Sequence, residues 1–192
     1  MELEMNPIEK LKICLDKAEK LSMENWNAMT LATATKEGFP SARIVLYKDL
    51  IDEKIIFYTN YHSRKGLEIL ENPNVAMVFY WEELGTQIRI RGIAKKTSRE
   101  LSEKYFKLRP IGSQISAIVS KQSQEFTNIV EVKEEIKSFQ KEGKEVECPN
   151  YWGGYEVSIN EIEFWSLGEN RFHDRSLYQR DELDWKEIYL YP

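Results

Sequence analysis

The chain has 192 residues, of which 42% are hydrophobic and 31% are charged, with 27 Lys and Arg against 32 Asp and Glu. This length allows one domain to bury its own core, and the apolar content argues against global disorder. A formal net charge of −5 gives no general attraction to nucleic acid or to anionic membranes. Any anion-binding site must therefore be a local concentration of cations.

The N-terminus and the cysteines predict a cytoplasmic protein with free thiols. The first five residues include two glutamates and lack the basic region and apolar run of a secretory signal, and no window approaches the ~20 apolar residues of a membrane span. Cys14 and Cys148 lie far apart, without a CxxC pair or histidines at zinc-ligand spacing. We expect no metal site, and a disulfide is the less favoured alternative to two free thiols.

The residue pattern predicts an antiparallel β-barrel with peripheral helices. Hairpin-like connections join short β-prone runs, and both the βαβ rhythm of a parallel sheet and a glycine-rich phosphate loop are missing. We expect a single domain over 1–192, with a helix and a short arm over 1–26 and a barrel with inserted helices over 27–192. The predicted elements, in chain order, are a helix over 7–21, strands over 28–35, 42–47 and 55–60, a helix over 64–72, strands over 75–81 and 87–93, helices over 98–108, from Gly112-Ser113 and over 126–139, and strands over 155–159, 162–166, 171–178 and 185–190.

The segment from Ser63 predicts a phosphate-binding helix start. Ser63 is a suitable N-cap, Leu67 and Leu70 supply an apolar stripe, and Arg64 and Lys65 occupy the first turn. Cations at that end of a helix are disfavoured by ~0.3–1 kcal/mol each. Free backbone N–H groups, a hydroxyl and two cations together are suited to bind an anion. The alternative is a charged turn exposed to solvent.

Two other segments combine polar groups in a similar way. Tyr105 and Arg109 are four residues apart on one face of a predicted helix, and Ser113 follows beyond Pro110, so the three could hold a second oxyanion. The alternative there is a packed tyrosine and a surface arginine. In 126–139 the apolar residues follow a helical pattern and predict core packing.

The segment 171–175 gathers two arginines and a histidine. In a strand, Arg171, His173 and Arg175 would share one face, where neighbouring cations ~7 Å apart repel unless an anionic or electron-rich group lies across them. A solvated edge strand whose charges prevent aggregation is the alternative.

Taken together, these motifs closely resemble the pyridoxamine 5′-phosphate oxidase family, from about Asn27 to the C-terminus. Any one motif alone is weak, but eight in the same order make the resemblance specific. They are Arg43-Ile44-Val45-Leu46-Tyr47-Lys48, Phe57-Tyr58-Thr59-Asn60, Ser63-Arg64-Lys65-Gly66, Tyr105-Phe106-x-x-Arg109-Pro110-x-x-Ser113-Gln114, Ser120-Lys121-Gln122-Ser123, Trp152-Gly153-Gly154-Tyr155, Glu163-Phe164-Trp165 and Arg171-Phe172-His173-Asp174-Arg175.

The resemblance implies an FMN-binding split barrel that works as a homodimer with FMN at the subunit interface. It implies oxidation of pyridoxamine or pyridoxine 5′-phosphate to pyridoxal 5′-phosphate, with O₂ as acceptor and H₂O₂ as product. The positions that would contact FMN are Arg43, Val45, Leu46, Lys48, Tyr58, Thr59, Arg64, Lys65, Gln87, Gln122, Ser123, Trp165 and Arg175. The positions that would bind the substrate are Lys48, Tyr105, Arg109 and Ser113 at its phosphate and Arg171 and His173 at its ring.

The implied catalytic roles fall to two residues. Hydride transfer from the substrate C4′ to the flavin N5 would be assisted by Arg171, which stabilises charge, and by His173, which orients the substrate or relays a proton. The interpretation requires Arg64, Lys65, Arg109 and Arg171 to share a cleft. Because Arg43 and Lys48 are an odd number of residues apart, a bulge, a strand end or the dimer partner must reconcile their directions.

Departures from the family pattern leave two alternatives open. We find no counterpart ahead of Pro7 of the N-terminal Arg and Tyr that close over the substrate, which predicts weaker closure. Thr86, Arg91, Glu156 and Tyr191 also differ from the residues common in the family. The first alternative is a non-catalytic or weakly active binder of FMN or pyridoxal phosphate. The second is a deazaflavin or haem protein on the same barrel, with haem disfavoured by the presence of only two histidines.

Overall fold

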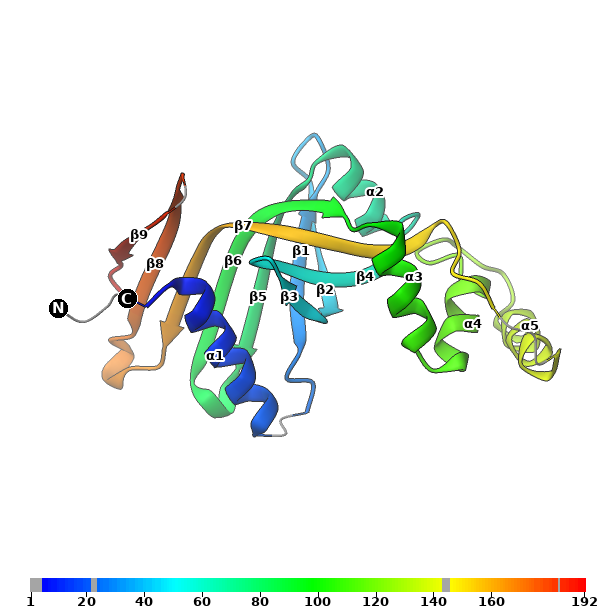
Figure 1. Cartoon of the computed structure of the whole chain (residues 1–192), viewed down its shortest axis with the longest axis horizontal. Helices are drawn as coiled ribbons and strands as arrows, with labels where there is room; N and C mark the ends of the chain where they lie inside the picture. Colours follow the sequence, from blue (N-terminus) through cyan, green and yellow to red (C-terminus); the bar gives the residue numbers. More distant parts are fainter. Residues whose placement is uncertain (1–4, 22–23, 143–145, 183) are drawn as a thin grey trace.

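The computed structural model describes residues 5–21, 24–142, 146–182 and 184–192, and Figure 1 shows their arrangement. Strands and helices agree with the predicted order. The elements are α1 (Pro7–Lys20), β1 (Ala28–Ala34), β2 (Pro40–Leu46), β3 (Asp49–Ile51), β4 (Lys54–Asn60), α2 (Arg64–Glu71), β5 (Asn74–Trp81), η1 (Glu82–Leu84), β6 (Thr86–Lys96), α3 (Arg99–Leu108), α4 (Ile111–Val119), α5 (Ile129–Glu142), β7 (Trp152–Ser166), η2 (Glu169–Arg171), β8 (Asp174–Asp181) and β9 (Asp184–Tyr189).

All the strands belong to one antiparallel sheet, which curls into a half-barrel. Its main path is β2-β1-β5-β6-β7-β4-β3, and β8 and β9 continue from β7 off this path. The long strand β7 makes the curl possible because its first half pairs with β4 and its second half with β8, while β6 runs along its other edge. The predicted split β-barrel with peripheral helices is therefore confirmed.

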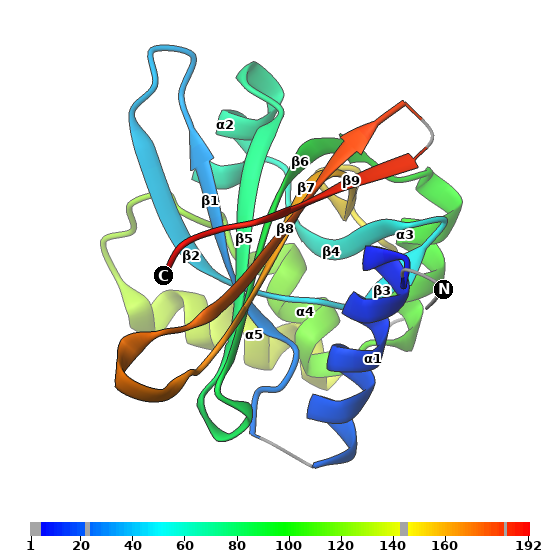
Figure 2. The ribbon, with the colours of Figure 1, turned by 90° about the vertical axis from the view of Figure 1, so that its left-hand side faces the viewer.

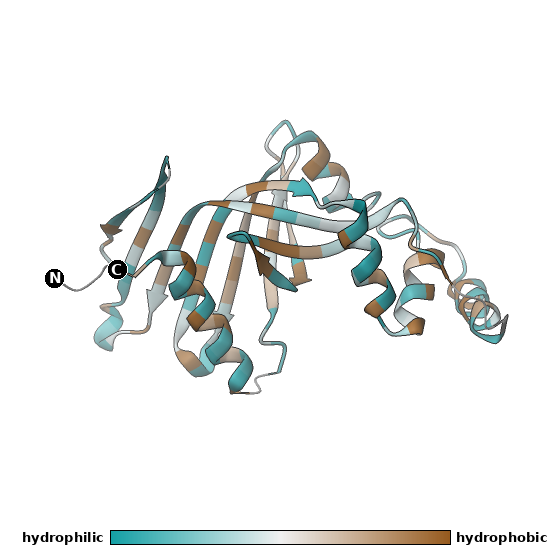
Figure 3. Cartoon of the chain, viewed as in Figure 1, coloured by the Kyte–Doolittle hydropathy of each residue, from teal (hydrophilic) through white to brown (hydrophobic). Residues whose placement is uncertain are grey.

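The core lies between α1 and the sheet. In β5 every second residue is buried, and hydrophobic and hydrophilic bands alternate along the strands in Figure 3. The predicted N-terminal helix is confirmed, since Ile8, Leu11, Leu15 and Ala18 are its buried apolar residues and belong to the same cluster as β5. Asn6 begins α1 by accepting a hydrogen bond from the Ile8 N–H at 2.8 Å.

A β-bulge replaces the predicted break between two strands at 155–159 and 162–166. Arg91 pairs with Glu161 and Gly92 with Ile159, so Asn160 is an extra residue and β7 continues through it. The backbones approach closely there, because a Cβ on Gly92 would lie 2.2 Å from the Ser158 carbonyl oxygen. The two-strand prediction was wrong because polar Asn160 marks a bulge instead of a turn.

Two helices pack differently from the prediction. In α2 the buried residues are Lys65, Gly66, Glu68 and Ile69, whereas Leu67 and Leu70, the predicted apolar stripe, are exposed. Lys65 donates to hydroxyl groups, and Glu68 accepts from hydroxyl and guanidinium groups, so both polar residues can face inward.

The helix predicted over 126–139, which is α5, also differs from the prediction. It begins at Ile129, with Asn128 accepting a hydrogen bond from the Val130 N–H, and none of its described side chains is buried. In Figure 1 it lies beside α4 at the end of the molecule farthest from β9. In a single chain its apolar residues are half-buried, as Val132, Ile136 and Phe139 are, or exposed, as Ile129 and Val130 are. Among the described residues, no helix is long and apolar enough to cross a membrane.

The bulge gives a test of the fold. Gly92→Ala should lower the free energy of unfolding by about 1–3 kcal/mol, because the added methyl group meets backbone that cannot move aside. The control is Gly112→Ala in α4, whose Cβ would meet only Gln140 Nε2 at 3.7 Å. Urea denaturation measures both, and a Gly92→Ala variant as stable as Gly112→Ala would contradict the close approach.

Candidate active site

A cavity of about 590 Å³ lies where the ends of β2 and β4 meet α3 and α4. Three of its lining residues, Lys48, Lys65 and Arg109, carry positive charge, and no Asp or Glu is among its described lining residues. Its lining comprises Ile44, Val45, Leu46, Lys48, Tyr58, Thr59, Asn60, Lys65, Tyr105, Leu108, Arg109, Pro110, Ser113, Ser116, Ala117, Ser120, Gln122 and Trp152. In a chain of net charge −5 this is a strong local preference for an anion.

The start of α2 places a buried cation at the cavity. The Ser63 hydroxyl caps the helix, as predicted, and Lys65 is 7% exposed. Lys65 Nζ donates to Thr59 Oγ1 and Ser63 Oγ, both at 3.1 Å, so its hydrogen-bond partners are neutral. Burial is the main reason that the pKa of Lys65 falls to about 8; the Arg43 charge lowers it further, and Glu68 opposes the shift.

Beside Lys65, the buried carboxylate of Glu68 binds two arginines. Its Oε1 accepts from Arg64 Nε at 2.9 Å, and its Oε2 accepts from Arg43 Nη2 at 3.3 Å and from the hydroxyls of Thr33 and Ser41. Burial alone would raise the pKa of Glu68, but the hydrogen bonds and the Arg43 charge lower it to about 2.

The guanidinium of Arg43 forms hydrogen bonds mainly with other groups of the protein. Its Nη1 donates to the Leu31 carbonyl and to Thr33 Oγ1, and its Nη2 donates to Ser41 Oγ and Glu68. Only its Nε–H has no acceptor among the described residues. Figure 2 shows α2 beside the β1–β2 hairpin, which is the arrangement that brings Arg43 to this helix.

Three nearly parallel aromatic rings form one wall of the cavity. Tyr58 lies 3.9 Å from Tyr105 and 5.5 Å from Trp152 between ring centroids, with interplanar angles of 12° and 10°. Burial raises the pKa of Tyr58 to about 12, so its phenol stays protonated. The Arg109 guanidinium lies 4.7 Å from the centroid of the Trp152 ring.

Arg109 lies at the junction of two helices. It is the C-cap of α3, and Pro110 is the N-cap of α4, so the predicted cap at Gly112-Ser113 is wrong by two to three positions. Ser113 instead lies in the first turn, where its N–H donates to the Pro110 carbonyl. Arg109 Nη1 is buried and has no hydrogen-bond partner among the described residues, and burial lowers the pKa of this guanidinium.

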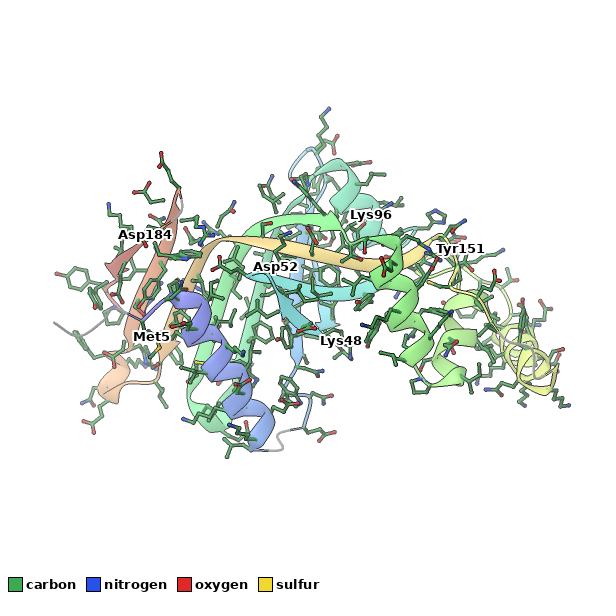
Figure 4. The ribbon with its side chains drawn as sticks, viewed as in Figure 1. Met5, Lys48, Asp52, Lys96, Tyr151 and Asp184 are labelled. Atoms are coloured by element: carbon green, nitrogen blue, oxygen red, sulfur yellow. The ribbon has the colours of Figure 1, made fainter. Side chains whose placement is uncertain are left out.

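Lys48 also lines this cavity. Strand β2 ends at Leu46, so Lys48 lies past the strand and the alternation that would oppose it to Arg43 no longer applies. Its Nζ lies 6.0 Å from the Tyr105 ring centroid, and Figure 4 shows Lys48 between the strands and α3. Arg43 is not among the residues that line this cavity and binds Glu68 instead, so a single chain does not bring Arg43 and Lys48 to one site.

A second group of predicted residues lies on β6, β7 and β8. Gln87 pairs with Trp165, and Trp165 pairs with Arg175, so the three form one row across the sheet. The His173 ring lies 4.6 Å from the Trp165 ring, and its Nδ1 accepts from the Gly168 N–H at 3.3 Å. This bond leaves Nε2 as the nitrogen that faces a ligand or solvent.

Glu163 supports this second group as Glu68 supports the first. It is 5% exposed and accepts hydrogen bonds from Arg175 Nε at 2.9 Å and from Arg89. Burial would raise the pKa of Glu163, but these two arginines hold it below its usual value. A cavity of about 670 Å³ opens beside His173 and Arg175 and reaches the C-terminal residues.

Arg171 precedes β8, which begins at Asp174 and not at Arg171 as predicted. Its φ of +65° belongs to the left-handed region, so strand alternation does not place its side chain, which is exposed. The predicted shared cleft is wrong for a single chain: Lys65 and Arg109 line one cavity, whereas Arg64 and Arg171 do not line it.

The predicted site residues thus fall into separate groups. Val45, Leu46, Lys48, Tyr58, Thr59, Lys65, Tyr105, Arg109, Ser113 and Gln122 line the first cavity. Gln122 also accepts from Thr59 Oγ1 at 3.2 Å, while its neighbour Ser123 is exposed at a φ of +70°. In Figure 1, α3 and α4 lie toward one end of the long axis and β8 toward the other.

The sequence did not predict that Glu68 and Glu163 bind the site arginines, nor that three aromatic rings form one wall of the first cavity. The spacing of Arg64 and Glu68, four apart on one helix, was an available signal. The contact of Trp152 with Tyr58 and Arg109 had no sequence signal, because it depends on the pairing of β4 with β7 and on the position of α3.

The fold defines the class to which the chain belongs, that of split-barrel proteins. An FMN binding protein from Nostoc punctiforme, described as pyridoxamine 5′-phosphate oxidase-related, superimposes with a TM-score of 0.79 over 99% of this chain and 100% of its own. It is 14% identical in sequence, so this likeness concerns the fold alone.

Sequence comparison then identifies the family. The family sequence model described as "Pyridoxamine 5′-phosphate oxidase" matches 15–141, and that described as "Pyridoxine 5′-phosphate oxidase C-terminal dimerisation region" matches 152–192. The pyridoxine/pyridoxamine 5′-phosphate oxidase of Leptospira interrogans is 48% identical over 169 residues, covering 86% of this chain and 79% of the relative. That of Rubrobacter xylanophilus is 43% identical over 189 residues, covering 97% and 87%. The chain belongs to the pyridoxamine 5′-phosphate oxidase family, which confirms the resemblance.

A solved structure with a different ligand is also similar. PhzG from Burkholderia lata, crystallised with tetrahydrophenazine-1-carboxylic acid, has a TM-score of 0.95 and 31% sequence identity. The likeness covers 100% of this chain and 95% of PhzG.

The Glu68 network predicts acid sensitivity. A folded-state pKa of about 2 against an ordinary 4.5 means that Glu68 stabilises the fold above about pH 4.5, and that this contribution is lost as the pH falls toward 2. Glu68→Gln should therefore flatten the dependence of unfolding free energy on pH in this window. Urea denaturation at several acidic pH values measures it, and parallel curves for parent and variant would contradict the assignment.

Proposed function

We propose that the protein is an FMN-dependent oxidase that converts pyridoxamine or pyridoxine 5′-phosphate to pyridoxal 5′-phosphate, with O₂ as acceptor and H₂O₂ as product. The observation that carries the proposal is the acid-free cavity, which sets three cations beside a stack of aromatic rings. Such a cavity suits a flat, phosphorylated aromatic molecule. Membership of the family supports the same reaction.

The substrate phosphate would bind where Arg109 lies. Its buried, unpartnered Nη1 needs an anion or another acceptor, and Lys48, Tyr105 and Ser113 line the same cavity and would supply further donors. A dianionic phosphate can accept hydrogen bonds from several donors at once and also neutralises their positive charge.

The residues present also fit the phosphate of FMN. Lys65 is a buried cation whose hydrogen-bond partners are hydroxyls, and Arg64 keeps both Nη groups without partners among the described residues. When bound, FMN would supply a hydride acceptor and pass the electrons to O₂. The other side chains proposed to hold it are Val45, Leu46, Lys48, Tyr58, Thr59, Gln87, Gln122, Ser123, Trp165 and Arg175, with Arg43 limited to its Nε–H.

The separation of the site residues favours a homodimer. The first cavity lacks His173 and Arg171, and the region that carries these two matches a dimerisation region. A second copy would bring its β7–β8 segment to the cavity of the first. There Arg171 would stabilise charge on the substrate ring, and His173 Nε2 would orient the substrate or move a proton.

Turnover is the direct test of the proposal. FMN-loaded protein supplied with pyridoxamine 5′-phosphate should form pyridoxal 5′-phosphate and H₂O₂ in equal amounts. A spectral change on ligand addition without turnover would instead indicate the non-catalytic binder. Oxidation of a reduced phenazine carboxylate, with no reaction of the B6 phosphates, would place the substrate nearer the PhzG ligand and contradict the proposal.

Arg109 allows a specific prediction. Arg109→Ala should lower kcat/KM for pyridoxamine 5′-phosphate by about 10- to 100-fold, mainly through KM, because it removes charge-assisted hydrogen bonds worth ~1.5–3 kcal/mol. The control Lys107→Ala removes the same charge from an exposed position on α3. Steady-state kinetics compares them, and equal kinetics for the two variants would remove Arg109 from the site.

Lys65 predicts a pH dependence of FMN binding. Below its pKa of about 8 the ammonium is charged and attracts phosphate, and above it the neutral amine does not. The Kd of the apoprotein for FMN should therefore rise between about pH 7 and pH 9, whereas Lys65→Arg should stay flat because a guanidinium remains charged. Fluorescence titration measures both, and an equally steep rise in Lys65→Arg would assign the effect to another group.

A further inference from the structure

We propose that Glu68 is a positioning residue for FMN, which fixes the Arg64 guanidinium in the orientation that receives the cofactor phosphate. The inference rests on the proposed function, because it assigns how one half of the FMN site is ordered. Glu68 would not itself touch the cofactor.

The two oxygens of the Glu68 carboxylate bind different partners. Its Oε1 accepts the Nε–H of Arg64 at 2.9 Å, which fixes the plane of that guanidinium. Its Oε2 accepts from Ser41 at 2.5 Å, from Arg43 at 3.3 Å and from Thr33, so the carboxylate is held by β1 and β2. Arg64 is thereby tied to the sheet and not only to its own helix.

The donors left over point to a ligand. The Arg64 side chain is 66% exposed, and its two Nη groups have no hydrogen-bond partners among the described residues. Held only at Nε, the guanidinium presents a fork of N–H donors to an incoming anion. Arg43 cannot do this, because all four of its Nη hydrogens have protein acceptors.

A purely stabilising role explains the arrangement less well. Ion pairs with an exposed partner contribute little to stability, and burying a carboxylate is costly unless its lone pairs are satisfied. Glu68 is 5% exposed, next to Ile69 on the buried face of α2, where an apolar residue would pack without those requirements. What the carboxylate adds is a fixed orientation for Arg64, which lowers the entropy lost when an anion binds.

The local charge remains suited to phosphate. Arg43, Arg64 and Lys65 contribute three positive charges and Glu68 one negative charge, so the start of α2 keeps a net charge of +2. Glu68 also offsets the unfavourable placement of two cations in the first turn of the helix. Both effects let the site stay folded and cationic before FMN binds.

The test separates phosphate recognition from general damage. Apoprotein is titrated with FMN and with riboflavin, which lacks the phosphate, and the ratio of the two Kd values is the readout. Glu68→Gln should weaken FMN binding by about tenfold and leave riboflavin binding within about twofold, because only the phosphate contact depends on Arg64. The matched control is Glu71→Gln, an exposed glutamate on the same helix, which should change neither.

A double-variant cycle assigns the effect to Arg64. In an Arg64→Ala background, Glu68→Gln should cause little further loss of FMN affinity, because the residue through which it acts is gone. An unchanged FMN to riboflavin ratio in Glu68→Gln, or an equal loss for both ligands, would overturn the inference.

Two outcomes need their own controls. If Glu68→Gln gives no folded apoprotein, Ser41→Ala removes one donor to Glu68 Oε2 and should shift the same ratio in the same direction by a smaller factor; an unshifted ratio would overturn the inference. Failure of the parent apoprotein to bind FMN would contradict the proposed function, whereas parent-like FMN binding by Glu68→Gln would contradict only the role of Glu68.

Discussion

The structure depends on cations that are buried beside neutral groups in an acidic chain. Lys65 donates hydrogen bonds to hydroxyls, and Arg109 Nη1 is buried without a partner among the described residues, in a cavity whose described lining carries no carboxylate. Removing such charges from water is unfavourable unless an anion returns the lost interactions. The lowered pKa of Lys65 reflects the cost of burying its charge, and a bound phosphate would offset this cost.

The carboxylates that could neutralise these cations are placed behind the site instead of in it. Glu68 binds Arg43 and Arg64, and Glu163 binds Arg89 and Arg175, in each case from a buried position. This arrangement keeps an arginine oriented while its positive field still faces outward. The two halves of the proposed site therefore share one physical design, although they lie on different parts of the sheet.

Local features were predictable from the sequence, and features that depend on distant contacts were not. The cap at Ser63 and the apolar face of α1 follow from short-range rules, and the structure confirms them. The inward turn of Glu68 was not predictable, because its partners come from β1 and β2. The apolar pattern of α5 predicted burial, yet in a single chain α4 covers it only in part, and its apolar residues are half-buried or exposed. The family motifs named the site residues and implied a site at a subunit interface, but they did not indicate which of those residues one chain brings together.

That separation leads to the central claim, that two copies of the chain complete one site. Subunit complementation tests it most directly. Arg109→Ala damages the cavity half and His173→Ala the β7–β8 half, so each homodimer should have little activity. When the two variants are unfolded and refolded together, half the dimers become hybrids with one intact site, and activity should recover to roughly a quarter of the parent value. A mixture no more active than the separate variants would contradict the account.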